Sequence, residues 1–408
     1  MAIAEGSTSY FAYKKEATPN TAETGSGGTV LRRVTGVVNL VKPEVTSQEK
    51  RTDFQELNVL HGTRSVDWSI NSEMFGGDYD EFLAALLRRD FAGVTTITET
   101  TTSDEFTISS GVLTRGNGAA SFITDGLYEG MVIRLTGMNT AGNNSRNIRI
   151  TAMTATTLTL AAVDGGAAVA DDSGGGGSAT IVIPGQATWI PSTGHTSDTF
   201  TIEKHETKTD TSHVGHGCKV GIGEINVSPD QPITLNFSGI GIDRASYSAG
   251  NAPVLTSPTA AGTGSAMSAG IGFIRVGGAS VAVVTSLAMT IDNGLSNQPV
   301  VANNVSPDVF YGRASQVTGT ITVLKEGVTI SDYFDDETEV TLDFFIAAPG
   351  SEPRAFYNLY LKRVKLNSAD EDDPDGPTIQ TFSFRALKPT TATGVNETTI
   401  MLQDSSIS

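Results

Sequence analysis

Cysteine, cationic side chains and long apolar runs are all scarce in this chain of 408 residues. Cys218 is the only cysteine, which excludes an intrachain disulfide and hence a disulfide-stabilised secreted scaffold. Lys and Arg number 27 against 45 Asp and Glu, a formal net charge of −18, so a protein that grips nucleic-acid phosphates is disfavoured. No run approaches the roughly 18 apolar residues of a membrane-spanning helix. We therefore expect no membrane partner and no specific binding of DNA.

Motifs for catalysis and metal binding are missing as well. The sequence has neither a G-x-x-x-x-G-K-[ST] phosphate loop nor a G-x-S-x-G nucleophile turn. Adjacent carboxylates such as Asp335 and Asp336 would face opposite sides of a strand, so they do not form an acid–base pair by themselves. Four histidines cluster just before the cysteine, but their spacing matches no established zinc module. They are His195, His205, His213 and His216. We expect no enzyme activity, no cofactor and no metal.

Short strands are what the sequence does contain. Thr, Val, Ile and Phe alternate with polar residues, and Gly, Asn, Asp or Pro interrupt the runs. One helix is expected over Asp78–Asp90, where Asp78 suits the N-cap and Glu81 has the spacing of a capping box. The apolar residues of this segment recur at i, i+3, i+4, i+7 and i+8, which predicts a helix that covers a sheet.

Two pairs of segments indicate an internal repeat. His61–Leu83 resembles Tyr311–Phe334, since each begins with an aromatic ring and a glycine and continues into a strand. Cys218–Ile240 resembles Leu361–Leu387, since each has a strand, an Asp/Pro turn and a second strand that starts after a proline. The matched segments keep the same order in both halves. We therefore predict two copies of one fold.

The first copy is interrupted by an insertion. Phe82 and Cys218 are 136 residues apart, whereas the matching Tyr333 and Leu361 are 28 apart. The surplus coincides with a Gly-, Ala- and Thr-rich stretch whose strands suffice for a small β-barrel or sandwich. The expected layout is 1–28 as an N-terminal arm, 29–94 and 197–246 as the first fold, 95–196 as the inserted β domain, 247–269 as a linker, 270–390 as the second fold and 391–408 as a C-terminal tail.

The stretch Val34–Arg89 resembles the tail tube, or major tail, proteins of long-tailed bacteriophages. A strand there leads into the polar excursion PEVTSQEKRTDFQEL, and the chain returns through GTRSVDWSINSEM to a helix that follows a Gly-Gly-Asp-Tyr turn. The strand–turn–strand at Val220–Gly239 adds to the resemblance. These patterns of residue type extend to the second half through the repeat.

The resemblance implies a mainly β protein with two tandem tail-tube-like β-sandwich or barrel folds, each with a short flanking helix, plus an inserted small β domain. It implies a structural virion protein that polymerises into stacked rings, the tail tube through which DNA is ejected into the host. With two folds per chain, three chains would form a pseudo-hexameric ring. The implied partners are further copies of the chain in homotrimer rings, the tape measure, tail-tip and tail-terminator proteins, and phage DNA in transit. The implied location is the virion tail, after assembly in the bacterial host cytoplasm.

In that family an arm reaches the neighbouring ring, and here it corresponds to Lys42–Leu60. The charged residues of this arm are Lys42, Glu44, Glu49, Lys50, Arg51, Asp53 and Glu56. Their mixed signs suit pairing with charges on the next ring, while a disordered surface loop stays an open alternative. The matching excursion Asp292–Val309 is nearly uncharged, so we expect it to act by strand addition and apolar contact.

An acidic lumen would repel DNA and keep friction low. The candidates for its lining are Asp335, Asp336, Glu337 and Glu339. The acidic run at 370–375 is a second candidate, with a solvated hairpin tip as the alternative reading.

Two other functions stay open at this point. One is a capsid decoration protein or tail-tip adhesin with the insert as receptor-binding module, and the other is a β-rich polysaccharide depolymerase. We expect the insert to project outward from the ring, and Phe11 and Tyr13 to become ordered only in the polymer. The predicted core residues are Trp68, Ile70, Phe82 and Leu86, with Val317, Ile321, Tyr333 and Phe334 as their partners in the second copy.

Overall fold

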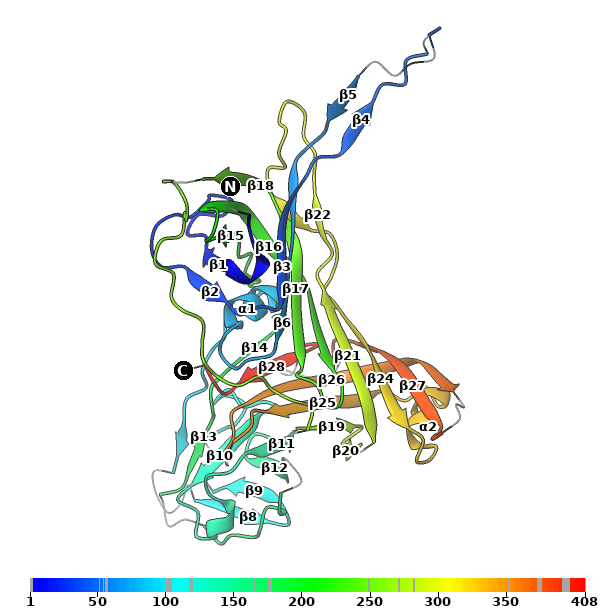
Figure 1. Ribbon diagram of the computed structural model, residues 1–408. Helices are drawn as coiled ribbons and strands as arrows, with labels where there is room; N and C mark the ends of the chain where they lie inside the picture. The colour runs from blue at the N-terminus through cyan, green and yellow to red at the C-terminus, as the bar shows by residue number, and fades with distance from the viewer. Residues whose placement is uncertain are drawn as a thin grey trace.

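The computed structural model of the protein is mainly β, as the sequence predicts (Figure 1). It describes residues 3–50, 52–53, 55, 58–99, 105–116, 120–163, 166–174, 178–248, 250–270, 272–281, 283–350, 353–372, 376–390 and 397–407.

One series of antiparallel strands occupies the first half of the chain. Its members are β1 (Ser9–Lys15), β2 (Thr29–Leu31), β3 (Thr35–Val41), β6 (Ser65–Glu73), β15 (Phe200–Glu206), β16 (Thr211–Val227), β17 (Thr234–Gly241) and β18 (Asp243–Tyr247). They pair in the order β3–β6–β17–β16–β15–β1, while β2 pairs with β1 and β18 pairs with the first part of β16.

A second series occupies the other half. Its members are β19 (Gly272–Val276), β20 (Ala279–Ser280), β21 (Val284–Asp292), β24 (Gln316–Leu324), β25 (Val340–Ala347), β26 (Phe356–Asp372), β27 (Ile379–Ala386) and β28 (Met401–Asp404). They pair in the order β21–β24–β27–β26–β25–β19, while β20 pairs with β19 and β28 pairs with the first part of β26. Strand for strand, the pairing pattern is that of the first series.

The two series are joined inside the chain by a ladder between β16 and β21. It runs from the pair Ile222–Asp292 to the pair Val227–Leu287. This in-chain joint produces a continuous antiparallel sheet in the order β3–β6–β17–β16–β21–β24–β27–β26, called the central sheet below. Its long strands cross the middle of the molecule in Figure 1. Among the described residues, both outer strands of this sheet, β3 and the second part of β26, have no further pairing partner on their outer side.

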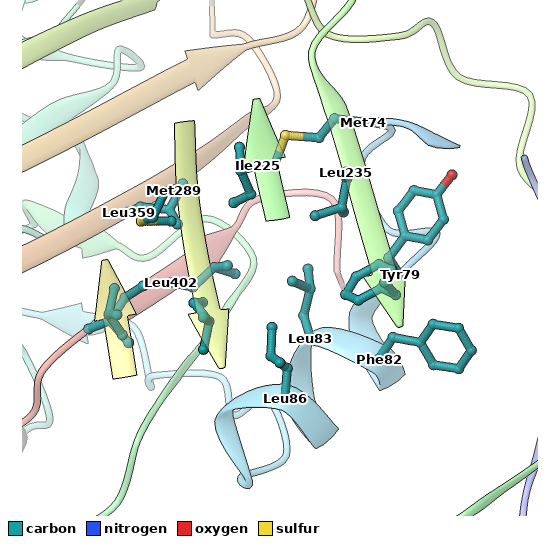
Figure 2. Packing of buried hydrophobic residues seen from close by; sticks show 14 of the residues in the cluster. Met74, Tyr79, Phe82, Leu83, Leu86, Ile225, Leu235, Met289, Leu359 and Leu402 are labelled. Carbon is teal, nitrogen blue, oxygen red and sulfur yellow. The ribbon is translucent and has the colours of Figure 1, made fainter. Parts of the chain in front are cut away.

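One hydrophobic core lies behind the central sheet. Helix α1 (Asp80–Leu87) turns Leu83 and Leu86 toward strands β16 and β17, as Figure 2 shows, and its Phe82 packs on rings of β1, β6, β15 and β17. Leu86 approaches β16 so closely that a Cβ on Gly223 would collide with it, which explains the glycine there. Side chains from the second half, among them Met289, belong to the same cluster. The predicted core residues of the first fold are buried.

The helix differs from the prediction at its ends. Tyr79 and not Asp78 occupies the N-cap position, and the helix begins at Asp80. The carboxylate of Asp78 bonds elsewhere: it accepts hydrogen bonds from Arg32 (3.4 Å) and from the amide of Gly262 (3.2 Å). At the other end Arg88 takes a left-handed conformation (φ 59°) that stops the helix. The predicted capping box and the last helical residues were therefore wrong.

Helix α2 (Thr329–Asp335) follows β24, as α1 follows β6. Its Tyr333 and Phe334 are only partly buried but pack against the core, whereas Val317 and Ile321 are fully buried. This half of the sandwich is therefore covered by a shorter and less buried helix.

The insert forms its own sheet between α1 and β14 (Gln186–Trp189). Its strands are β7 (Ile97–Thr98), β8 (Phe106–Ser109), β9 (Val112–Arg115), β10 (Val132–Thr136), β11 (Ile148–Met153), β12 (Thr157–Ala162) and β13 (Thr180–Val182), paired as β7–β13–β10–β11–β12–β9–β8. A separate cluster of apolar residues fills it. In Figure 1 it lies at the opposite end of the molecule from β4 and β5.

Strand β25 separates the insert from the central core. Leu342 and Phe344 belong to that core, while Phe345, the next residue along the strand, packs with Val132 and Val163 of the insert. The insert and the central sheet therefore lie on opposite faces of the sheet that contains β25 and the first part of β26.

Both ends of the described chain belong to the sheets. Phe11 and Tyr13 lie on β1, which pairs with β15, and they are buried in the core of the single chain. The expectation that they become ordered only in a polymer was wrong, because Tyr13 packs on Phe82 with ring centroids 4.7 Å apart. At the other end, β28 pairs with both β14 and β26.

Candidate assembly surfaces

The face of the central sheet that turns away from the core is polar. Along each strand, buried residues such as Trp68 and Ile70 alternate with exposed ones such as Asp67 and Asn71. The carboxylates exposed on this face include Asp67, Glu224 and Asp370, and the exposed cation Arg385 lies on β27. No helix among the described residues packs over it. We call this surface the open face.

Strand β3 is an unprotected edge of the central sheet. Among the described residues it pairs with β6 alone, and Arg244 donates a side-chain hydrogen bond to the carbonyl of Val38 (3.0 Å) without adding a strand. Its sequence TGVVNLV has neither charge nor proline, and Val37 is 43% exposed. Soluble proteins usually protect such an edge with charge, proline or a bulge. A strand edge without charge or proline is suited to pair with another strand.

The second part of β26 is the other edge. From Lys365 to Asp372 its described residues pair only with β27, after a bulge between Leu366 and Ser368. The matching strand β16 has its bulge at the equivalent place, between Val220 and Ile222, and there the far edge is occupied by β21. The edge of β26 therefore has the same local structure as the edge of β16 that pairs with β21.

The predicted arm is a hairpin that extends from the body of the protein. Strands β4 (Glu44–Thr46) and β5 (Val59–His61) pair with each other only, and all six residues are exposed. Figure 1 shows this hairpin projecting beyond the rest of the chain. The predicted arm residues Lys42, Glu44, Glu49, Lys50 and Asp53 lie exposed on it or at its base, whereas Arg51 and Glu56 lie outside the described residues.

A second hairpin leaves the body beside the first. Strands β22 (Leu295–Asn297) and β23 (Val309–Tyr311) pair, and the loop between them meets the base of the arm where the Arg64 amide donates to the carbonyl of Asn304 (2.7 Å). The loop presents Val301 almost fully exposed, at 98%. The chain thus carries one charged and one apolar hairpin at the same end of the sheet.

The four predicted lumen residues lie together, at the end of α2 and in the turn that follows it. Asp335 ends α2, and Asp336, Glu337 and Glu339 follow in the turn to β25, all exposed. Arg363 bonds both carboxylate oxygens of Glu339 (2.6 and 2.7 Å) and holds the pKa of that carboxyl below its usual range. Glu337 pairs with Lys365 (3.0 Å). These contacts fix the turn to β26.

The insert is fastened to the second half by buried polar contacts. Nη1 of Arg149 lies 3.1 Å from Oδ2 of Asp343, both side chains being almost inaccessible, and Arg149 also bonds Asn358. Burial raises the pKa of Asp343, although Arg149 and Arg275 oppose the rise. Gln403 of β28 adds a two-way bond to the backbone of Val132, at 2.9 and 3.0 Å. These contacts hold the insert in one orientation.

Three of the four clustered histidines, His205, His213 and His216, lie on the paired strands β15 and β16, and His195 precedes them outside any strand. His205 on β15 bonds Ser212 (2.9 Å), and His213 on β16 bonds Ser246 (2.9 Å). In the part of the chain that the structure describes, no group of three His, Cys, Asp or Glu side chains is placed to hold a metal ion. Within the same residues, no helix is long and apolar enough to cross a membrane.

Sequence reasoning missed the open face because it searched for runs of acidic residues. Asp67 and Glu224 stand singly, each between residues that face the core, so no run marks them. The signal that was available is alternation: a polar residue at every second position opposite a buried partner. Asp370 belongs to the acidic run at 370–375, of which Asp373 and Asp375 lie outside the described residues.

Comparison with known proteins agrees with this architecture. A family model described as phage tail tube protein matches residues 6–386, from just before β1 to the end of β27, and so includes the insert and every strand of both series except β28. No curated protein matches the chain.

Proposed function

The chain belongs to the phage tail tube protein family, and from this premise we propose that three copies close into a ring and that rings stack into the conduit for the phage genome. The protein is a structural component of the virion tail. The observation that carries the finer proposal is the in-chain joint: two series of strands with one pairing pattern already share a continuous sheet. Each chain thus supplies two of the six positions in a pseudo-hexameric ring.

The domain layout follows from the two series. We assign β1 to the first fold and β28 to the second, so that each fold has eight strands of the series, a hairpin and a helix, joined by a linker at 247–269. The insert at 95–196 interrupts the first fold but rests on the second.

Ring dimensions are compatible with passage of DNA. The central sheet contributes eight strands per chain, so three chains give a barrel of 24 strands. With strands about 4.8 Å apart and tilted by about 40°, its backbone diameter is about 48 Å. Side chains narrow the bore by about 10 Å, which leaves more than the width of a duplex, about 20 Å.

The open face is the surface that we assign to the lumen. Its exposed Asp67, Glu224 and Asp370 outnumber the cations Arg385 and, opposite it on β26, Lys365, so DNA phosphates meet repulsion and not a counterion-releasing surface. We assign Asp335, Asp336, Glu337 and Glu339 to the corner next to α2 instead, where two of them brace β26. With the open face inward, the insert lies on the outer side of the ring.

Stacking is assigned to the two hairpins. The arm at β4–β5 offers charges of both signs to the next ring, and the β22–β23 hairpin offers the exposed Val301. Tape measure, tail-tip and tail-terminator proteins would meet the same end surfaces at the two ends of a tube. Assembly takes place in the host cytoplasm before the tail joins the particle.

Negative-stain microscopy of the concentrated protein tests the proposal. We expect hollow rods whose end-on views show threefold symmetry with six similar lobes. Monodisperse monomers at every concentration would contradict it and favour an adhesin or decoration protein. Loss of mass from host polysaccharide on incubation would instead favour a depolymerase.

Deleting residues 44–56 tests the role of the arm in stacking separately from the folding of the chain. The deletion removes β4 and the residues that follow it and takes no residue from the core, so we expect folded, soluble protein that no longer forms rods. Unchanged rods would remove the role assigned to the arm. Circular dichroism of the variant provides the control for folding.

A further inference from the structure

The in-chain joint specifies the register of the joint between neighbouring chains, and this inference rests on the proposed ring. The two strand series can be superposed residue by residue through their ladders. Phe237 lies opposite Ile70, and Phe382 lies opposite Ile321. Ile70 lies opposite Gly36, and Ile321 lies opposite Leu287. Strand β3 thus corresponds to β21 with a constant offset.

The same procedure relates β16 to β26. Directly after the bulge in each strand, Ile222 lies opposite Ser238, and Ser368 lies opposite Ser383. Ile222 therefore corresponds to Ser368, and Glu224 to Asp370. In the in-chain joint, Glu224 lies opposite Thr290. The residue of β3 that corresponds to Thr290 is Asn39.

We infer that residues 368–372 of β26 pair antiparallel with residues 37–41 of β3 of a second copy of this chain, with Asp370 opposite Asn39. The joint is thus a repetition between chains of the ladder that β16 and β21 form within one chain. Ser368 lies opposite Val41 at one end and Asp372 lies opposite Val37 at the other.

The direction of the strands agrees with a closed ring. The central sheet has an even number of strands, all antiparallel to their neighbours. The β3 of a following chain in the same orientation is therefore antiparallel to β26, as the inferred ladder requires. A joint between two different edges is heterologous, and heterologous joints close into rings when the rotation allows.

The faces of the paired residues agree as well. Asn39 and Asp370 are both exposed on the open face, so the side-chain amide of Asn39 can donate to the carboxylate of Asp370. Two β26 edges would instead oppose Asp370, Glu371 and Asp372 to their own copies, and like charges directly opposite destabilise a pair of strands. Charge repulsion thus disfavours pairing between two β26 edges, whereas the uncharged β3 can pair with β26 without it.

Disulfide crosslinking in assembled protein tests the register. The variant Asn39→Cys/Asp370→Cys is polymerised under reducing conditions, checked for tubes by microscopy, oxidised and run on a non-reducing gel. Directly opposite residues of an antiparallel pair have Cα atoms about 4.5–5.5 Å apart, within the range of a disulfide. The only native cysteine, Cys218, is buried and does not compete.

Two matched variants complete the design. Glu224→Cys/Thr290→Cys places the same pair in the in-chain joint and should form an intrachain disulfide even in dissolved monomers. Thr35→Cys/Asp370→Cys keeps the open face but shifts the register by four residues, about 14 Å, beyond disulfide reach.

We expect the Asn39/Asp370 variant to give covalent dimers and trimers and nothing larger, and the shifted variant to give roughly ten-fold less. Tubes that form without this crosslink, while the in-chain control crosslinks, would overturn the register but leave the proposed function standing. Failure of the wild-type chain to form any tube would refute the proposed function and the joint with it.

Discussion

Replacing Arg149 by Met should loosen the insert from the second fold. The guanidinium of Arg149 is buried beside Asp343, with Nη1 and Oδ2 3.1 Å apart, and it bonds Asn358 as well. The Arg149→Met change preserves much of the volume but leaves the carboxylate of Asp343 buried without its nearest cation. Losing one partner of a buried ion pair typically destabilises by about 3–5 kcal/mol. Arg275 still faces Asp343, so we expect about 3 kcal/mol.

Hydrogen exchange read by mass spectrometry is a suitable assay, because the insert and the two folds need not unfold together. Peptides from β10, β11 and β25 should exchange through openings that are about 100-fold more populated in the variant. Peptides from β6 and β17 should be unchanged. The surface change Lys365→Met, which breaks an ion pair with the largely exposed Glu337, is the control and should alter exchange little.

The effect should also depend on pH. Burial raises the pKa of Asp343, so the folded protein takes up a proton on this carboxyl more readily than the unfolded chain. Removing Arg149 raises that pKa further. A raised carboxyl pKa means that stability is lost as pH rises, so the variant should be closer to wild type at pH 4.5 than at pH 8. A loss below about 1 kcal/mol at pH 8, or a loss that grows as the pH falls, would refute the reasoning.

Three further predictions concern the core, the insert and the stacking hairpin. Phe82→Ala removes a ring packed on four aromatic neighbours and should lower the free energy of unfolding, measured by urea denaturation, by about 3–5 kcal/mol. The control Val34→Ala changes an exposed side chain and should lower it by less than about 0.5 kcal/mol. Burial alone would raise the pKa of Asp172, but hydrogen bonds from the amides of Thr140 and Gly174 lower it. The stabilisation of the insert by this carboxylate is therefore present above about pH 4 and is lost as the pH falls further. Hydrogen exchange of β8 should accelerate below that pH, and an exchange rate that does not change with pH would contradict this. Val301→Asp should permit rings but prevent their stacking, which sedimentation would show, whereas Val328→Asp on the exposed start of α2 should leave tubes intact.

The strands and the helix were predictable because each depends on local sequence. Alternation and proline turns predicted the strands of both halves, and the register of the structure aligns Val66 and Ile70 with Val317 and Ile321, as the sequence comparison does. The apolar spacing predicted the buried face of α1. The prediction of its start was wrong because the Asp78 carboxylate accepts hydrogen bonds from Arg32 and from the amide of Gly262, which only the tertiary structure brings close.

The surfaces were harder to predict because they depend on pairing between distant strands. Nothing local indicates that β1 pairs with β15 across almost 200 residues, so the buried Phe11 and Tyr13 looked like a free arm. The insert interrupts the first fold in sequence yet rests on the second through Arg149 and Asp343. Contacts of this kind carry no periodic signal, and a single sequence does not reveal them.

The number of chains in one ring tests the central claim most directly. A cryo-EM map of assembled tubes should contain three chains per ring, with the in-chain joint and the joint between chains alternating around one uninterrupted barrel of 24 strands. Six chains per ring, or a barrel broken at the margins of each subunit, would contradict the claim that one polypeptide provides two equivalent units of the wall.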